Sequence, residues 1–283
     1  MTTQPATPNI NHGSRIVRTA LLVNDIDSVK QFYRDVIGLA VVREQQGQVV
    51  LGAGDTPLLI LEEDPAAPAR PEASAGLFHT AFRVPSREAL GDALVRIRER
   101  WQLGGASDHW VSEAIYTSDP EGNGVEIYRD LPRDEWPLNA DGTIQIGTHP
   151  LDLNRLAADA TGASTIPAGA DIGHIHLEVT SLDAFEAFYI DTVGFEVQTA
   201  TPQAYFVAAG GYHHHLGANT WQHRNEPISG RGLAWFEILL PDADSLAQLQ
   251  KRCVAGSYTV SETADGLTVI DADGVAVRFS VDS

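Results

Sequence analysis

The 283-residue sequence is poor in cysteine and in positive charge, and each shortage excludes a class of protein. Its one cysteine, Cys253, can form no disulfide within the chain and lacks the partner thiolates of a structural zinc site. Nineteen Lys and Arg against 38 Asp and Glu leave a formal net charge of −19. Because nucleic acids and anionic membranes reward clustered positive charge, we expect neither as a partner.

Long apolar runs are also missing. No stretch approaches the roughly 20 apolar residues of a membrane span. The segment Met1 to Gly13 has neither a basic nor an apolar block, so we expect no secretory signal and a cytoplasmic protein. What the chain does have is 43% hydrophobic residues, enough for a packed core, and a length that suggests two domains.

An internal repeat organises the chain. The segment DSVKQFYRDVIG, which ends at Gly38, matches DAFEAFYIDTVG, which ends at Gly194, so the two copies lie 156 residues apart. The Gly-Leu pairs at 76 and 232 share this spacing. The turns DPEG at 119–122 and DADG at 271–274 are also alike. The chain is therefore a duplication, and each half contains two similar modules.

Each module begins with an expected strand and continues into an amphipathic helix and three short strands. The expected first strands are Val17–Val23, Phe78–Val84, Ile175–Val179 and Leu233–Leu240. Asp27 and Ser181 are the expected N-caps of two of the helices, and Gly38 and Gly194 their expected ends. The pattern is βαβββ, four times over.

A stretch rich in Pro, Ala, Gly and Asp separates the two halves. We expect a first pair of modules over 14–130, a linker over 131–171 and a second pair over 172–283. Leu153–Ala160 is the one segment of the linker expected to be helical. The linker is long enough for modules two and three to pair with each other in space.

Four βαβββ modules resemble the vicinal oxygen chelate superfamily, which includes glyoxalases and extradiol dioxygenases. The resemblance covers nearly the whole chain, and the layout with Tyr-His-His-His at 212–215 in module three looks like its catechol 2,3-dioxygenase-like subgroup. It implies an α+β fold in which the modules form two domains, each with a mixed sheet curled around a site. In that family each module offers metal ligands from its first and its last strand.

These positions can be found in each module. The first-strand position holds Arg18, His79, His174 and Trp235 in modules one to four. The last-strand position holds apolar residues near Leu59, then Glu126, then the run His213–His215, then Arg278. All potential donors therefore belong to modules two and three.

From these we predict a metal site of His79, Glu126 and His174. Two histidines and one carboxylate suit non-haem Fe(II), and Mn(II) accepts the same ligands. Zinc also binds His and Glu, so donor type alone does not identify the metal. His176 shares a strand face with His174 and is a rival ligand.

The resemblance also implies residues for catalysis and substrate binding. DPEGNGVE, which ends at Glu126, is similar to the motif of the extradiol metal glutamate, and Tyr116 precedes it by the family's ten residues. YHHHLGAN resembles the strand that carries the family's acid–base histidine, which matches His214. On a strand, His214 would face away from both neighbouring histidines. The expected substrate-binding residues are His109, His176 and Asn219.

Together these features indicate an Fe(II)-dependent extradiol dioxygenase that cleaves a catechol-type diol with dioxygen, in the degradation of aromatic compounds. The oligomeric state stays open, with a homo-oligomer among the options. Two other functions remain: a glyoxalase-like isomerase or lyase, which in this family usually has four donors with two carboxylates, and a metal-free protein that binds an aromatic ligand. A purely structural alternative has His79 hydrogen-bonded in the core and Glu126 paired with Arg18 or another arginine.

Overall fold

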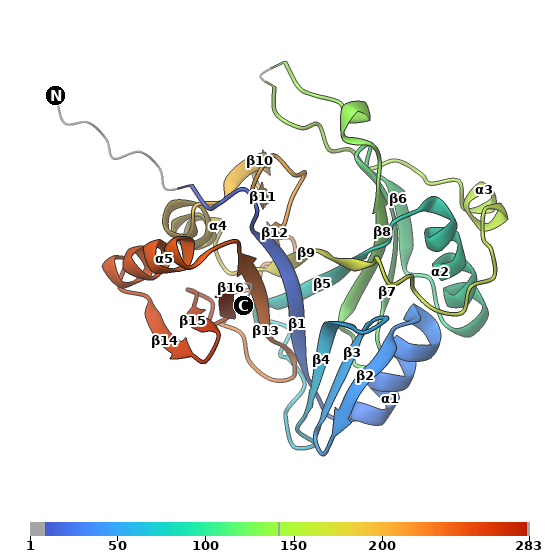
Figure 1. Ribbon diagram of the computed structural model, residues 1–283, viewed down its shortest axis with the longest axis horizontal. Helices are drawn as coiled ribbons and strands as arrows, with labels where there is room; N and C mark the ends of the chain where they lie inside the picture. Colours follow the sequence, from blue (N-terminus) through green and yellow to red (C-terminus); the bar gives the residue numbers. More distant parts are fainter. Residues whose placement is uncertain (1–8, 141, 282–283) are drawn as a thin grey trace.

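The computed structural model describes residues 9–140 and 142–281 and contains two eight-stranded mixed sheets (Figure 1). The first sheet has the order β14-β15-β16-β13-β1-β4-β3-β2. The second has the order β10-β11-β12-β9-β5-β8-β7-β6. Most of Met1–Gly13, where we expect no secretory signal, lies outside the described residues.

Modules one and four supply the first sheet. Its strands are β1 (Arg15–Val23), β2 (Ala40–Gln45), β3 (Gln48–Ala53), β4 (Thr56–Glu63), β13 (Gly232–Leu240), β14 (Thr259–Thr263), β15 (Gly266–Ile270) and β16 (Ala276–Val281). At its centre β1 and β13 pair antiparallel, and each pairs parallel with the last strand of its own module, β4 or β16.

Modules two and three build the second sheet in the same way. Its strands are β5 (Gly76–Arg83), β6 (Gly105–Asp108), β7 (Ser112–Ser118), β8 (Gly124–Asp130), β9 (Asp171–Glu178), β10 (Glu196–Thr201), β11 (Ala204–Ala208) and β12 (Leu216–Asn219). The central antiparallel pair is β5 and β9, flanked by their parallel partners β8 and β12. The predicted fold class, four βαβββ modules with curled mixed sheets, is confirmed. Each predicted first strand exists but begins one to four residues earlier.

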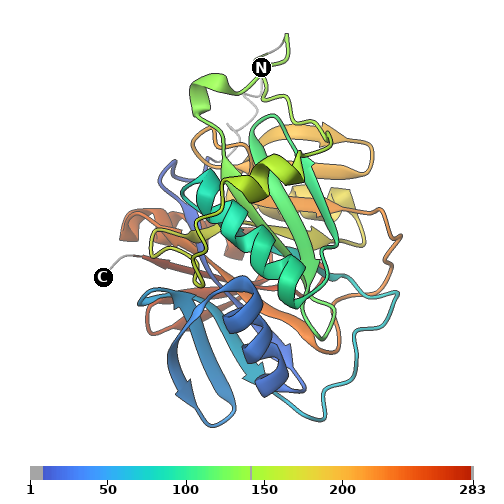
Figure 2. The ribbon, with the colours of Figure 1, turned by 90° about the vertical axis from the view of Figure 1, so that its right-hand side faces the viewer.

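The helices pack against the sheets and against each other (Figure 2). They are α1 (Ile26–Phe32), α2 (Arg87–Arg100), α3 (Leu153–Ala158), α4 (Leu182–Phe185) and α5 (Ala243–Ala255), with a 3₁₀ turn η2 (Arg133–Glu135). Two π-helical segments, η1 (Tyr33–Ile37) and η3 (Glu186–Val193), continue α1 and α4. None of the helices in the described ranges is long and apolar enough to cross a membrane.

The two repeated helices begin and end for local reasons. Gly38 and Gly194 adopt φ of +93° and +97°, so both predicted helix ends are confirmed. Ser181 accepts a hydrogen bond from a backbone N–H of the first turn and is confirmed as an N-cap. The prediction for Asp27 is wrong, because the side chain of Asp25 caps α1 instead.

The segment between the halves is tied to the second sheet. Its helix α3 packs on α2 and ends two residues before the predicted Ala160. The buried carboxylate of Asp92, on α2, accepts hydrogen bonds from the backbone N–H groups of Thr161 and Gly162. These bonds fix a segment whose composition alone indicates a loop.

Candidate metal centre and cavity

The second sheet holds a cavity of about 440 Å³. Phe78, Phe206 and Trp221 give it aromatic walls, and the segment between the halves adds Ile146 and its two following residues. Seven of the eight predicted site residues line it: His79, His109, Tyr116, Glu126, His174, His176 and His214. Residues far apart in the sequence thus share one site.

Three of these side chains, which we call the donor triad, point at a common position: His79, Glu126 and His174. Nε2 of His79 lies 2.9 Å from Oε2 of Glu126 and 3.3 Å from Nε2 of His174. Nε2 of His174 lies 3.1 Å from the same carboxylate oxygen. The triad is the one group of three or more potential donors found among the described residues.

The spacing of the donor triad suits a metal ion. Ligand bonds of about 2.1 Å at right angles separate neighbouring donor atoms by about 3.0 Å. The three observed separations, 2.9, 3.1 and 3.3 Å, lie close to that value. The three atoms could therefore bind one ion from the same side, which leaves its other side for further ligands. The residues present fit a divalent ion.

Strand register brings the donor triad together. His79 and His174 lie on the antiparallel neighbours β5 and β9. β8 runs parallel to β5 and sets Glu126 beside Ala81, two residues beyond His79 and therefore on the same face. Since Ala81 has only a methyl group, the Glu126 side chain has room to reach the histidines.

Burial and charge set the ionisation of the donor triad. Burial raises the pKa of Glu126, but the charges and hydrogen bonds of His174 and His79 outweigh it and hold that pKa well below the usual value. Burial lowers the pKa of His174 to about 4, against the opposing charge of Glu126. At neutral pH the site therefore offers a carboxylate and a neutral imidazole, the forms that bind metal.

The last-strand position of module three is not the histidine run His213–His215. The run lies in an irregular segment, and β12 begins after it at Leu216. In module two Glu126 pairs with Ala81, which lies two residues after His79. In module three the equivalent residue, two after His174, is His176, and it pairs with Gly217. Gly217 is therefore the counterpart of Glu126, so this position adds no second carboxylate.

Gly217 instead makes room for His176. A Cβ added at Gly217 would lie 2.9 Å from the His176 ring. Nδ2 of Asn219 donates to Nε2 of His176 at 3.0 Å, and His176 does not belong to the donor triad. Asn219 is fully buried and lies behind His176, outside the cavity lining. His176 packs against Phe78 and Trp221 as part of the cavity wall.

Tyr116 and His109 form a pair on the other side of the cavity. Nδ1 of His109 lies 2.6 Å from the carbonyl oxygen of Gly147, to which it must donate. In the neutral ring Nε2 then accepts, and the hydroxyl of Tyr116 donates to it at 2.7 Å. Burial and the charge of Glu126 raise the pKa of Tyr116 well above its usual value, so it keeps its proton.

His214 packs beside one member of the donor triad, His174. Its ring centre lies 4.1 Å from that of His174 and 5.1 Å from that of Phe206. Burial, and then the positive charge of nearby histidines, lowers the pKa of His214 well below its usual value.

The expected alternation of His213, His214 and His215 on a strand is wrong, because the run has no strand geometry.

In the first sheet the corresponding positions hold no donor cluster. Glu237 is buried and accepts two hydrogen bonds from the guanidinium of Arg18. Arg278, which corresponds to Glu126, stacks 3.6 Å above the ring centre of Trp235. Arg18 is therefore the partner of Glu237, and the alternative in which it pairs with Glu126 is wrong.

Comparison with known proteins agrees with this architecture. Residues 15–127 match the Glyoxalase/Bleomycin resistance protein/Dioxygenase superfamily. A catechol-2,3-dioxygenase of Bacillus subtilis (strain 168) is 38% identical over 283 residues, which cover 96% of this chain and 99% of that protein. The chain belongs to the Glyoxalase/Bleomycin resistance protein/Dioxygenase superfamily.

Other similar proteins include both dioxygenases and glyoxalases. A biphenyl-2,3-diol 1,2-dioxygenase 3 of Rhodococcus globerulus is 30% identical over 120 residues, 41% of this chain and 63% of that protein. The crystal structure of glyoxalase I from Zea mays has a TM-score of 0.58 at 14% identity and covers 95% of this chain and 92% of its own. The glyoxalase shares the fold alone. The full-length sequence match groups this superfamily member with the dioxygenases.

Proposed function

We propose that the protein is an extradiol dioxygenase that uses Fe(II) to cleave the ring of a catechol-type diol. The observation that carries the proposal is the donor triad in an aromatic-walled cavity. Two histidines and one carboxylate on one face of the ion are the ligand set of non-haem Fe(II) oxygenases. The full-length similarity to a catechol-2,3-dioxygenase supports the same chemistry.

The residues around the donor triad are suited to binding an aromatic diol and excluding water. The aromatic walls Phe78, Phe206 and Trp221 would hold the flat ring of the diol and exclude water. The donor triad would hold Fe(II), which when bound would supply the redox chemistry between the diol and dioxygen. Both oxygen atoms would enter the product as the carbon–carbon bond beside the diol breaks.

Two side chains would handle protons and charge. His214, neutral because burial lowers its pKa, would accept a proton from one diol hydroxyl. Tyr116 keeps its proton, which in the structure it donates to His109; with substrate bound, it would turn this O–H to the ring-derived oxygen as charge develops there. His109 would hold the Tyr116 hydroxyl at the edge of the cavity.

The glyoxalase-like alternative has less support. In this superfamily such isomerases usually have two carboxylates, and the counterpart of Glu126 in module three is Gly217. Of the described residues that line the cavity, Glu126 is the one carboxylate. The donor set therefore favours an oxygenase.

The test is to supply the protein with Fe(II), catechol and air. We expect dioxygen uptake and a yellow ring-opened product, both abolished by His79→Ala. Iron-loaded protein that consumes no dioxygen with any catechol would overturn the proposal. Tight binding of an aromatic ligand by metal-free protein would favour a binding function instead.

A further inference from the structure

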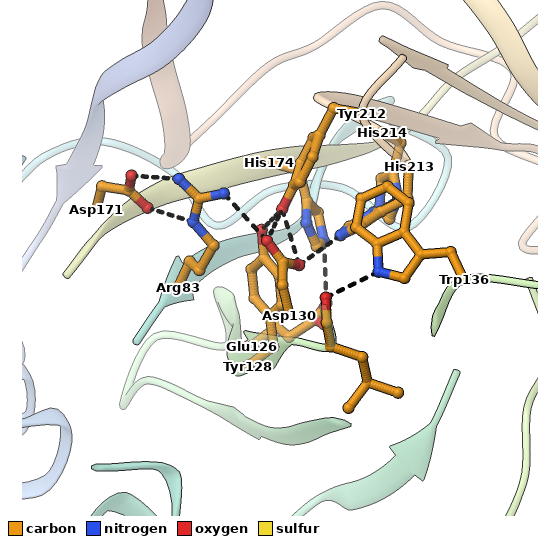
Figure 3. A network of polar contacts seen from close by, with 11 residues as sticks. Arg83, Glu126, Tyr128, Asp130, Trp136, Asp171, His174, Tyr212, His213 and His214 are labelled. Atoms are coloured by element: carbon orange, nitrogen blue, oxygen red, sulfur yellow. Dashed lines mark hydrogen bonds and ion pairs between the residues drawn. The ribbon is translucent and has the colours of Figure 1, made fainter. Parts of the chain in front are cut away.

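A chain of hydrogen bonds leads from His214 away from the cavity (Figure 3). Nδ1 of His214 lies 2.8 Å from Nδ1 of His213. Nε2 of His213 lies 2.8 Å from Oδ1 of Asp130, at the end of β8. His213 is fully buried, with its ring against Trp136. We call Asp130, His213 and His214 the relay.

Asp130 is held as an anion at one end of the relay. Nη1 of Arg83 donates to its Oδ2 at 3.1 Å, and the hydroxyl of Tyr212 lies 3.0 to 3.1 Å from both carboxylate oxygens. Burial raises the pKa of Asp130, but the hydrogen bond from His213 and the charge and hydrogen bond of Arg83 bring it below the usual value. Arg83 also donates two hydrogen bonds to Asp171, which contacts no member of the relay.

The anion sets the direction of the first hydrogen bond in the relay. An ionised carboxylate can only accept, so Nε2 of His213 donates to Asp130. The neutral form of His213 has one N–H and uses it on Asp130, so in that form its Nδ1 accepts from the Nδ1–H of His214. Nε2 of His214 then carries a lone pair. No residue in the described ranges hydrogen-bonds this atom, and His214 lines the cavity.

We propose that Asp130 is a positioning residue, which acts through His213 to fix the orientation and tautomer of His214 so that its Nε2 faces the substrate as a proton acceptor. Neither Asp130 nor His213 lines the cavity. The catalytic part of this proposal rests on the proposed ring-cleavage function. The tautomers do not, and they can be measured without turnover.

The first test is spectroscopic. Long-range ¹H–¹⁵N spectra of protein labelled with ¹⁵N-histidine and loaded with diamagnetic zinc report which ring nitrogen carries the proton. We expect an Nδ1–H tautomer for His214 and an Nε2–H tautomer for His213, with signals assigned from single variants. Asp130→Asn should remove the preference at both rings. An Nε2–H tautomer of His214 in the unaltered protein would overturn the proposal, whatever the protein catalyses.

The second test is kinetic and uses a matched control. Asp130→Asn should lower kcat at least about tenfold, because a positioned base contributes roughly 10²–10⁴-fold, with KM for catechol nearly unchanged. Asp171→Asn removes the other carboxylate on Arg83 and should leave kcat within about twofold. His213→Phe keeps a ring in the buried site, breaks both hydrogen bonds, and should match Asp130→Asn.

The decisive comparison is made in a His214→Ala background. If Asp130 acts through His214, Asp130→Asn should cause no further loss there, whereas a general structural defect would lower kcat in both backgrounds. Equal losses in both, or an equal loss from Asp171→Asn, would refute the proposal. Absence of turnover in the unaltered protein would count against ring cleavage, and the spectra would still decide the relay.

Discussion

Gly217→Ala should destabilise the protein and disturb the cavity wall at once. The new Cβ would lie 2.9 Å from Cγ and Nδ1 of His176, closer than Cβ contacts ordinarily come. The ring cannot retreat freely, because Nε2 is bonded to Asn219 and its faces pack on Phe78 and Trp221. Overpacking of a filled core costs about 1–3 kcal/mol.

The effect of Gly217→Ala should appear in both thermal stability and substrate binding. For a chain of this size 1 kcal/mol corresponds to roughly 2–4 °C, so we expect Tm to fall by about 2–12 °C in calorimetry. Because His176 is part of the cavity wall, KM for catechol should also rise. Gly105→Ala is the matched control: Gly105 is likewise in a strand of the second sheet, and the nearest neighbouring atom to its new Cβ is 3.9 Å away. Equal Tm and KM values for the two variants would refute the packing argument.

Three further predictions concern the metal, the pH dependence and the cavity wall. Glu126→Gln should abolish retention of Fe(II) on gel filtration, whereas Glu237→Gln in the first sheet should not; equal iron content in both would contradict the donor triad. Burial lowers the pKa of His215 to about 3, so as pH falls below about 6.5 this histidine takes up a proton in the unfolded chain but not in the folded one. Urea denaturation should therefore show the free energy of unfolding falling between pH 7 and pH 5, by about 2 kcal/mol more in the unaltered protein than in His215→Gln. Trp221→Ala removes a wall residue that is 41% exposed, so KM for catechol should rise with little change in Tm; a large fall in Tm with unchanged KM would assign Trp221 to the core.

Much of the architecture could be predicted from the repeat, because the same strand and helix patterns recur at a constant spacing. The sharing of sheets between modules depends on contacts between distant segments. β5 and β9 are about 90 residues apart in the sequence, and nothing local to either strand specifies the other as its partner. The π-helical ends of α1 and α4 were likewise not predicted, because their residues keep helical spacing.

The donor triad could be predicted because its members occupy equivalent positions in their modules. The histidine run was misassigned because YHHHLGAN alone is compatible with a strand. In the structure Gly210 and Gly211 both have positive φ, which turns the chain and delays β12 to Leu216. Asp130 was missed entirely, since its role depends on contacts more than 80 residues away along the chain.

An anomalous-scattering map of an iron-loaded crystal, recorded at the iron absorption edge, tests the central claim most directly. We predict one strong peak within about 2.3 Å of Nε2 of His79, Nε2 of His174 and Oε2 of Glu126. An iron-loaded crystal with no peak there, or with the peak beside His176 instead, would contradict the donor triad and the ring-cleavage function built on it.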